Sequence, residues 1–294
     1  MLPMKSLPIA KRAQILGMLC EGMSIRATAR LADVSHNTIL KMIADVGRAT
    51  SDFQHEAFQN LPCKRVQVDE IWAFVGAKQK NAPEAKKLAG TAGDVWTWTA
   101  ICADTKIIPS WMVGSRDLDT GSVFVKDLAS RLANRIQLTS DGHKVYVTAV
   151  ERAFNWKVDY AMLVKHYGSM TETTEASRKY SPAECVGTSQ EIISGDPDKA
   201  HISTSYAERS NLTLRMGLRR FTRLTNAFSK KVENHAHAIA IHMMHYNFCR
   251  IHKSLRVTPA MAAGVAGHVW SLEEMAELGK PAAPATRGAY KKRV

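Results

Sequence analysis

Apolar residues recur at helical spacing over the first fifty residues of the chain. Three segments show this pattern, at 8–22, 24–34 and 35–47, and Ser24 and Ser35 stand where the second and third segments need an N-cap. Gly22 and Gly47 end the first and third segments, as expected of glycines at helix C-termini. The pattern predicts three short helices, followed by a linker helix within residues 49–63.

The third predicted helix presents polar side chains near its start. Its apolar residues share one face, which leaves four polar residues outward: His36, Asn37, Thr38 and Lys41. Two helices joined by a tight turn, with such residues on the second, are typical of a helix-turn-helix that contacts bases and phosphates. We expect residues 1–48 to form an all-α helix-turn-helix DNA-binding domain. A plain three-helix packing module is the alternative.

The pattern changes to that of strands after Pro62. Strands are expected at 65–75, 94–104, 106–115, 136–142 and 158–168, with helices at 119–135 and 143–154. Residues 169–203 are polar and predict a long loop or insertion. Two helices follow, at about 204–222 and at 230–252 after an N-cap at Ser229, and residues 263–294 are expected to form a C-terminal helix and a flexible basic tail.

This order of elements predicts an α/β domain over residues 64–262. It is compatible with a ribonuclease H-like fold, in which a five-stranded mixed sheet is flanked by helices, although the order alone does not single out that fold.

Three acids stand out by their positions in the predicted elements. Asp69 lies in the middle of the first strand, Asp141 at the end of the fourth, and Glu208 near the start of a later helix. In a ribonuclease H-like sheet the first and fourth strands are neighbours and a later helix crosses them, so these carboxylates would meet. Hard cations prefer carboxylate oxygens, and two Mg²⁺ ions suit phosphoryl transfer. Each acid alone is as well explained as a surface residue, and Glu70 competes with Asp69.

Basic residues surround Glu208 in the sequence. Residues 206–256 contain ten Lys or Arg and two acids. On a helical wheel, Asn211, Arg215 and Arg219 lie within about 60° of Glu208. With Lys231, we expect them to contact a DNA backbone; a solvated basic face is the alternative.

Charge and cysteine usage narrow the class of protein. The 294 residues include 40 Lys or Arg against 27 Asp or Glu, a net charge of +13, which favours an anionic partner such as nucleic acid. Five cysteines without a C-x-x-C pair argue against a disulfide framework or a zinc ribbon and fit a reducing compartment. No apolar run approaches the ~20 residues that span a bilayer, and no secretory signal is visible. We expect a cytoplasmic protein without a membrane partner.

Histidines gather along one side of the last predicted helix. The residues on this side are four histidines and one cysteine: His235, His242, His245, Cys249 and His252. A single straight stripe offers about two ligands to one ion, so we expect no zinc and assign these residues to the core or to DNA contacts. The sequence also lacks a Walker phosphate loop and a G-x-S-x-G elbow.

Three stretches together resemble the insertion-sequence-one family of bacterial transposases, within the DDE transposase and integrase superfamily. They are "VDEIWAFVGAKQK", "TSDGH" and "YAERSNLTLRMGLRRFTRLTNAFSKK", in the family's order, and "YNFCRIHKSLRVTPAMA" resembles the close of many such domains. The likeness covers about residues 66–255, with the helix-turn-helix upstream. Unlike the best-known members, the chain has no cysteine zinc ribbon, and its 169–203 segment is longer.

The resemblance implies a DNA transposase with a ribonuclease H-like DDE catalytic domain. Matched residue by residue, its metal-holding catalytic acids fall on Asp69, Asp141 and Glu208, with Glu70 in a supporting place. It also implies Mg²⁺, for which Mn²⁺ can substitute, inverted-repeat and target DNA as partners, and at least a dimer on DNA. A DNA-binding repressor with an inactive catalytic domain, or a metal-dependent nuclease that does not join strands, are the alternatives.

Overall fold

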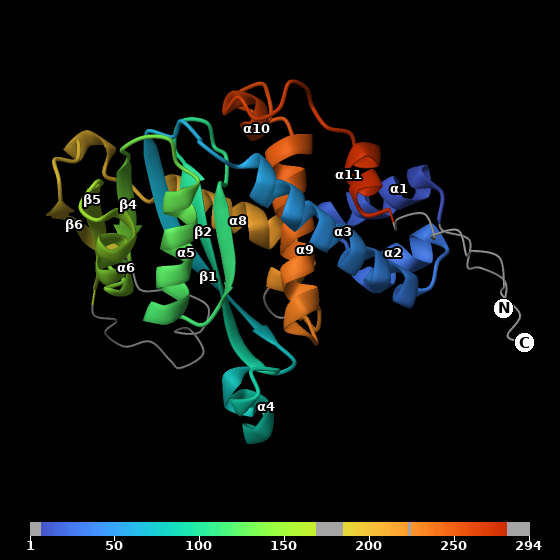
Figure 1. Ribbon diagram of the computed structural model, residues 1–294. Helices are drawn as coiled ribbons and strands as arrows, with labels where there is room; N and C mark the ends of the chain where they lie inside the picture. Colours follow the sequence, from blue (N-terminus) through green and yellow to red (C-terminus); the bar gives the residue numbers. More distant parts are fainter. Residues whose placement is uncertain (1–6, 169–184, 223–224, 281–294) are drawn as a thin grey trace, which may run out of the picture.

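The computed structural model describes residues 7–168, 185–222 and 225–280. A six-stranded mixed sheet in the order β3-β2-β1-β4-β5-β6 forms its centre, with helices on both faces (Figure 1). The strands are β1 (Arg65–Val75), β2 (Gly93–Cys102), β3 (Ser110–Gly114), β4 (Gln137–Asp141), β5 (Asp159–Tyr167) and β6 (Cys185–Ser194). The first three strands are antiparallel, β4 is parallel to β1 and β5, and β6 is antiparallel to β5. A mixed α/β sheet was expected, but with five strands rather than the six observed; the strand order agrees with a ribonuclease H-like fold.

Helices cover the two faces of the sheet unequally. On one face lie α5 (Leu118–Ser130) and α6 (Val145–Phe154), where the buried Trp98 ring packs against Phe124 and Tyr146. On the other face lies α8 (Ser205–Gly217), whose first backbone N–H groups bond to Gln67 of β1. Leu214, Leu218 and Phe221 are buried, so they serve the core as the helical wheel indicates.

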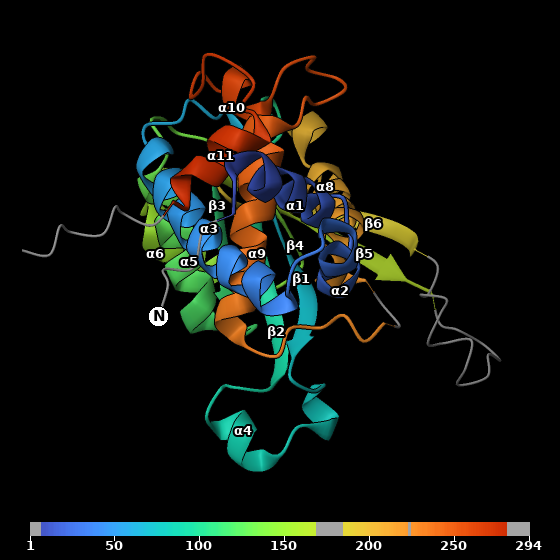
Figure 2. The same ribbon diagram turned by 90° about the vertical axis from the view of Figure 1, so that its right-hand side faces the viewer.

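The first helices form a layer against the helices from the end of the chain. They are α1 (Ile9–Cys20), α2 (Ile25–Ala32) and α3 (His36–Ala57), capped at α2 and α3 by the hydroxyls of Ser24 and Ser35 as expected. Figures 1 and 2 show α3 running along α9 (Val232–Met244), and α1 beside α11 (Leu272–Leu278). The π-helical turn His245–Cys249 extends α9, and α10 (Pro259–Ala262) follows.

The expected helix end at Gly47 was wrong, because α3 continues through it to Ala57. A Cβ on Gly47 would lie 2.5 Å from the His237 Cβ of α9. Gly47 is therefore a close crossing point of two helices, and the predicted linker helix is the second half of α3.

The expected helix over 204–222 also ends early, at Gly217, and Arg219 starts a separate 3-10 turn (Arg219–Phe221). A Cβ on Gly217 would lie 2.8 Å from Cε1 of His242, so α8 stops where the chain must pass closely over α9. Ser229 does not cap the last helix either; the residue before α9 is Lys231, and the Ser229 hydroxyl bonds elsewhere.

Part of the polar 169–203 segment is a strand rather than a loop. β6 lies at the sheet edge and is mostly exposed, so its sequence carries little of the apolar alternation that predicts a strand. Residues 169–184 of that segment, like the basic tail from 281 onward, lie outside the described residues.

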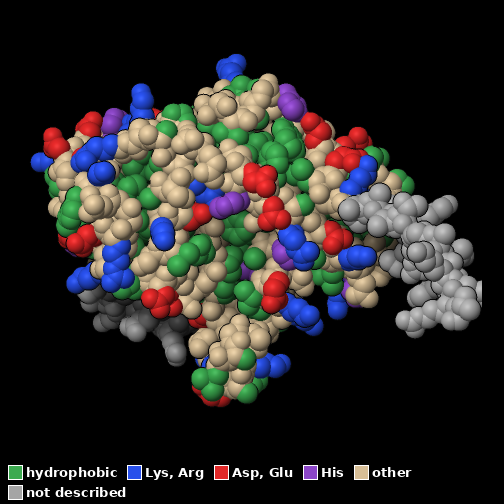
Figure 3. All heavy atoms as spheres, in the orientation of Figure 1, with side chains coloured by type: hydrophobic (Ala, Val, Ile, Leu, Met, Phe, Trp, Pro, Cys, Tyr) green, Lys and Arg blue, Asp and Glu red, His purple; other side chains and the backbone are tan. Residues whose placement is uncertain are grey.

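Strands β1 and β2 extend beyond the sheet as a long hairpin. Its tip carries the turn Gln79–Asn81 and α4 (Glu84–Leu88), which project from the body in Figures 1 and 2. Figure 3 shows one whole face with the hairpin at its edge, and basic and acidic side chains are interspersed over that face. In the part of the chain that the structure describes, no helix has both the length and the apolar character to cross a membrane.

Candidate metal centre

Two of the expected acids meet where β1 and β4 part. The parallel pairing runs from Arg65 with Gln137 to Gln67 with Thr139. Beyond it, β1 stays paired with β2 and β4 with β5. Asp69 and Asp141 each lie two residues beyond the last β1–β4 pair, Gln67 with Thr139. Their carboxylates therefore lie side by side where the two strands begin to separate.

A compact group of carboxylate oxygens results. One oxygen each from Asp69, Glu70 and Asp141 lies within 4.8 Å of the other two, the one such group of metal-ligand type among the described residues. Oxygens on opposite sides of one Mg²⁺ stand about 4.2 Å apart, twice the usual metal–oxygen distance. The spacing of these oxygens alone therefore suits the ligands of one divalent cation, after small movements.

Asp69 is the electrostatic centre of this group. Its Oδ1 accepts the Glu70 backbone N–H at 2.8 Å, and its Oδ2 accepts the Asn211 side-chain amide at 2.8 Å. Burial raises the pKa of Asp69 to about 7, with further contributions from the charges of Glu70, Asp141 and Glu208. A carboxyl group of this kind is only partly ionised near neutral pH, and a bound cation would favour its ionised form.

Glu70 points to the opposite face of the sheet and is satisfied there. Its side chain is 1% exposed, and Oε1 accepts the Arg116 guanidinium at 2.7 Å. Oε2 accepts the Tyr146 hydroxyl at 2.9 Å. Burial raises the pKa of Tyr146, so this hydroxyl stays protonated and donates. Because both oxygens are already engaged, Glu70 is better placed to fix neighbouring groups than to bind a cation.

Asp141 and His143 form a tight turn at the end of β4. The His143 backbone N–H donates to Oδ1 of Asp141 at 3.0 Å, and the His143 ring stacks on Trp98. Its Nε2 is buried, lies 3.8 Å from Oε1 of Glu70 and has no hydrogen-bond partner in the described structure. The Asp-Gly-His sequence thus directs one acid toward the gap and the imidazole toward Glu70.

Glu208 lies near the group but is not part of it. Its Oε1 accepts from Nζ of Lys165 on β5 at 2.6 Å and from the Thr204 hydroxyl at 2.6 Å. The side chain is 45% exposed, so it has room to turn. Its charge contributes to the raised pKa of Asp69, which places it within electrostatic reach.

Two polar contacts fix α8 over the acids. Oε1 of Gln67 accepts the backbone N–H groups of Tyr206 and Ala207, at 2.8 and 3.1 Å, and so satisfies the first turn of the helix. One turn further, Asn211 is buried and donates to Asp69, while its Oδ1 has no partner within the described residues. An oxygen left unpaired beside a raised-pKa carboxyl fits a place for a cation.

Asn211 thus differs from the exposed DNA contact that the helical wheel indicated. The wheel gives the direction of a side chain but not the depth at which its helix packs on the sheet. Arg215 is partly exposed, and Arg219 and Lys231 are exposed.

The candidate DNA contacts of α3 lie at its first turns. His36, Asn37 and Lys41 are exposed and Thr38 is partly buried. Asp33 joins α2 to α3 in the left-handed conformation at φ 50°, a tight turn that an Asp tolerates. In α9, by contrast, His235 and His242 are buried, and burial lowers the pKa of each to about 3.

Comparison with known proteins includes a distant structural likeness. No protein-family model and no curated protein matches the sequence. Among solved structures, the chain is similar to a piggyBac transposase in a synaptic complex with hairpin DNA, at 15% identity and a TM-score of 0.33. The likeness covers 77% of this chain and 54% of that one, so the chain spans about half the length of that transposase.

Sequence reasoning missed most of the contacts that hold the acids in place, and it assigned Asn211 to DNA rather than to Asp69. Arg116 and Tyr146 clamp Glu70, and Gln67 and Asn211 position α8 and Asp69. Gln67 had a signal, since it lies on the same strand face as Asp69 two residues earlier. Arg116 sits in a connection after β3, and no sequence pattern ties it to Glu70.

Proposed function

We propose that the chain is a DNA transposase of the DDE type, as its resemblance to the insertion-sequence-one family implies. The observation that carries the proposal is the meeting of Asp69 and Asp141 at the point where β1 and β4 part, beneath α8. Rigid elements on three sides hold these carboxylates together in spite of their mutual repulsion. Such an arrangement costs stability in the free protein and is useful to a protein that binds a cation there.

In this proposal Asp69, Asp141 and Glu208 are the catalytic metal ligands. Two Mg²⁺ ions held there, with Mn²⁺ able to replace them, would activate the attacking oxygen and stabilise the leaving oxygen of a phosphodiester. Asn211 orients Asp69, and Glu70 binds Arg116 and the Tyr146 hydroxyl on the other face of the sheet. Glu208 must exchange its bond with Lys165 for a position nearer Asp69, a rotation that its exposed side chain permits.

DNA recognition is assigned to the two basic parts of the chain. The first turns of α3, with His36, Asn37, Thr38 and Lys41, would bind the inverted repeats that end the element. Arg215, Arg219 and Lys231 would contact the phosphate backbone near the acids. Because two DNA ends are joined in one event, we propose at least a dimer on DNA, acting in the cytoplasm.

One observation favours a second candidate. The Lys165–Glu208 ion pair holds the third acid outside the carboxylate group. A chain in which that pair persists would bind DNA without joining it, as a repressor does, or would cut DNA without strand transfer.

A product assay separates these candidates. Purified protein is mixed with Mg²⁺, a target plasmid and DNA carrying the inverted repeats that flank its coding sequence. A transposase yields end DNA covalently joined to the plasmid. Cut DNA without joined product identifies a nuclease, and a stable complex without any new product in Mg²⁺ or Mn²⁺ identifies a repressor; either result contradicts the proposal.

A further inference from the structure

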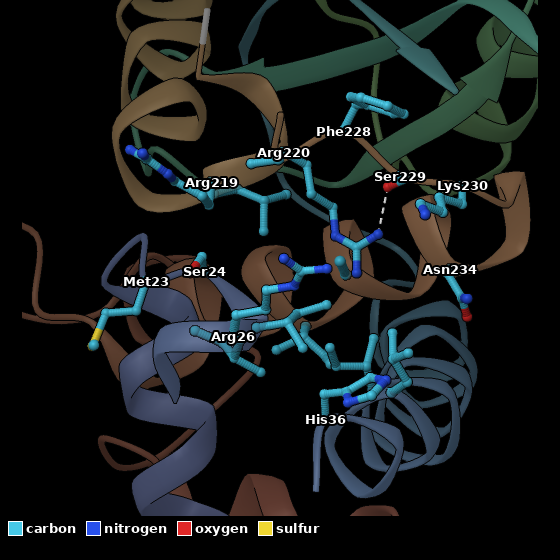
Figure 4. Close-up of a pocket in the computed structure, with 18 of the residues that line it drawn as sticks. Met23, Ser24, Arg26, His36, Arg219, Arg220, Phe228, Ser229, Lys230 and Asn234 are labelled. Carbon is cyan, nitrogen blue, oxygen red and sulfur yellow. Dashed lines mark hydrogen bonds between the residues drawn. The ribbon is translucent and has the colours of Figure 1, made fainter. Parts of the chain in front are cut away.

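A concave site that none of the three acids lines lies between the first three helices and the segment that leads into α9. Its cavity volume is about 850 Å³, within the range of small-molecule sites. One wall comes from α1, α2 and the start of α3, and the other from residues 218–242 (Figure 4). It therefore joins the predicted helix-turn-helix to the helices that cover the sheet.

The lining of this cavity is strongly cationic. Five Lys or Arg line it and no Asp or Glu does; the cations are Arg26, Arg219, Arg220, Lys230 and Lys231. None of the five makes an ion pair within the described residues. Figure 4 shows the guanidinium groups of Arg26, from α2, and Arg220, from the opposite wall, directed into the same space. Cations that converge without an acid call for an anion.

Arg220 gives independent evidence for a missing partner. One of its terminal nitrogens donates to the Ser229 hydroxyl, whereas Nη2 is buried and has no hydrogen-bond partner in the described structure. Burial lowers the pKa of this guanidinium to about 10, so the free protein holds the charge at a cost. Buried guanidinium groups are normally paired, and a phosphate oxygen is their natural acceptor.

Apolar side chains line another part of the cavity. They include Leu19, Ile25, Leu40, Ile43, Phe228 and Ile241. An inorganic ion would leave these side chains uncovered, whereas a group with a planar apolar part and an attached phosphate would use both parts of the lining.

We propose that this cavity binds one phosphate-bearing nucleotide, with the phosphate between Arg26 and Arg220 and the base against the apolar wall. The partner class rests on the proposed function, because a protein that acts on DNA meets such a group in every strand. The same chemistry is offered by a strand of DNA and by a free nucleotide, and the experiment distinguishes these two sources.

The test is equilibrium binding of the 5′-phosphorylated dinucleotide pTpT to the full chain by calorimetry, at one fixed salt concentration and without divalent metal. Thymidine, dTMP and inorganic phosphate are the comparison ligands. We expect pTpT to bind, thymidine not to bind, and inorganic phosphate to bind at least tenfold more weakly. Binding of pTpT tenfold tighter than dTMP assigns the site to a DNA strand, and equal binding assigns it to a free nucleotide; both results support the site.

Variants decide whether the nucleotide sits in this cavity. Arg26→Gln and Arg220→Gln should each weaken pTpT at least tenfold, and Arg220→Lys should weaken it less. Arg30→Gln, one turn along α2 and outside the lining, is the matched control and should leave affinity unchanged. Arg26 is exposed, so its variant is expected to fold even if Arg220→Gln does not.

Equal loss in the Arg30 and Arg26 variants, or affinity for thymidine equal to that for pTpT, overturns the proposal. Asp69→Asn should leave pTpT binding intact while abolishing strand transfer. Loss of strand transfer therefore tests the proposed function, and loss of pTpT binding tests this cavity.

Discussion

At the scale of single residues, the carboxyl group of Asp69 carries most of the electrostatic cost of the centre. Its pKa is raised to about 7, mainly by burial and next by the charge of Glu70. In the unfolded chain an Asp ionises near pH 3.9. Between these two pH values the folded protein binds a proton that the unfolded chain has lost, so folding is linked to pH at this residue.

We predict that the contribution of Asp69 to the free energy of unfolding, measured as the difference between wild type and Asp69→Asn, falls as pH rises from about 4 to about 7 in metal-free buffer. The part due to Asp69 amounts to at most about 4 kcal/mol, because each pKa unit corresponds to about 1.4 kcal/mol. Asp69→Asn removes this part, and Mg²⁺ at pH 7 should restore stability to the wild type but not to the variant. Urea titrations at a series of pH values measure both effects. Parallel pH profiles of the two proteins would contradict the assignment.

The bond between Lys165 and Glu208 gives a second prediction at this scale. Replacing Lys165 with Met frees the Glu208 carboxylate, so the Mg²⁺ concentration that gives half-maximal strand transfer should fall severalfold. Stability should change by less than about 1 kcal/mol, because the ion pair is partly exposed. Lys157→Met, an exposed lysine before β5, is the control. A higher Mg²⁺ requirement in Lys165→Met would show that the pair supports Glu208 rather than withholding it.

At the scale of elements, the crossing of α3 and α9 depends on one residue without a side chain. In Gly47→Ala the new Cβ meets the backbone of His237, with its carbonyl oxygen at 2.6 Å. The gain in helix propensity is about 1 kcal/mol, and overpacking costs about 1–3 kcal/mol or more, so we predict net destabilisation. Thermal unfolding checks the sign. Gly187→Ala, whose Cβ meets nothing within 4 Å, should be nearly neutral. A stabilised Gly47→Ala protein would mean that the two helices do not approach so closely.

The packing of α8 on β1 gives a further prediction. In Gln67→Met the side chain keeps its size but loses the oxygen that accepts from Tyr206 and Ala207. The buried Ala207 N–H is then unpaired at about 1–3 kcal/mol, the partly buried Tyr206 N–H at less, and α8 should shift with Asn211 and Glu208. We expect lower stability and at least tenfold slower strand transfer. Gln67→Glu retains an acceptor and should recover part of both, whereas full activity in Gln67→Met would show that this contact does not position the centre.

At the scale of the whole molecule, the sequence predicted the central strands of the sheet better than it predicted the edge strand and the helix ends. β-branched and aromatic runs marked β1 to β5, because the apolar side chains of those strands face the core. The exposed edge strand β6 had no such signal. Gly47 was predicted to end a helix, and Gly217 fell inside a predicted helix, although both serve close packing. A close approach between segments far apart in the sequence leaves no recognisable pattern in the residues around the glycine.

The same limit applies to the candidate site. The positions of Asp69 and Asp141 at matching places on two strands followed from the expected topology, and the structure brings them together. The partners of Glu70 and the pairing of Glu208 with Lys165 come from segments far apart in the sequence. Whether α3 reads DNA, and whether Glu208 completes the centre, remain predictions.

Strand transfer by the acid variants is the most direct test of the central claim, that Asp69 and Asp141 together hold the metal for joining DNA. A pre-nicked inverted-repeat end is incubated with target plasmid and Mg²⁺, using wild type, Asp69→Asn and Asp141→Asn, with end binding measured in parallel. We predict joined product from the wild type alone, a loss of at least a thousandfold in both variants, and unchanged end binding. Joined product from either variant at a rate near that of the wild type would contradict the account.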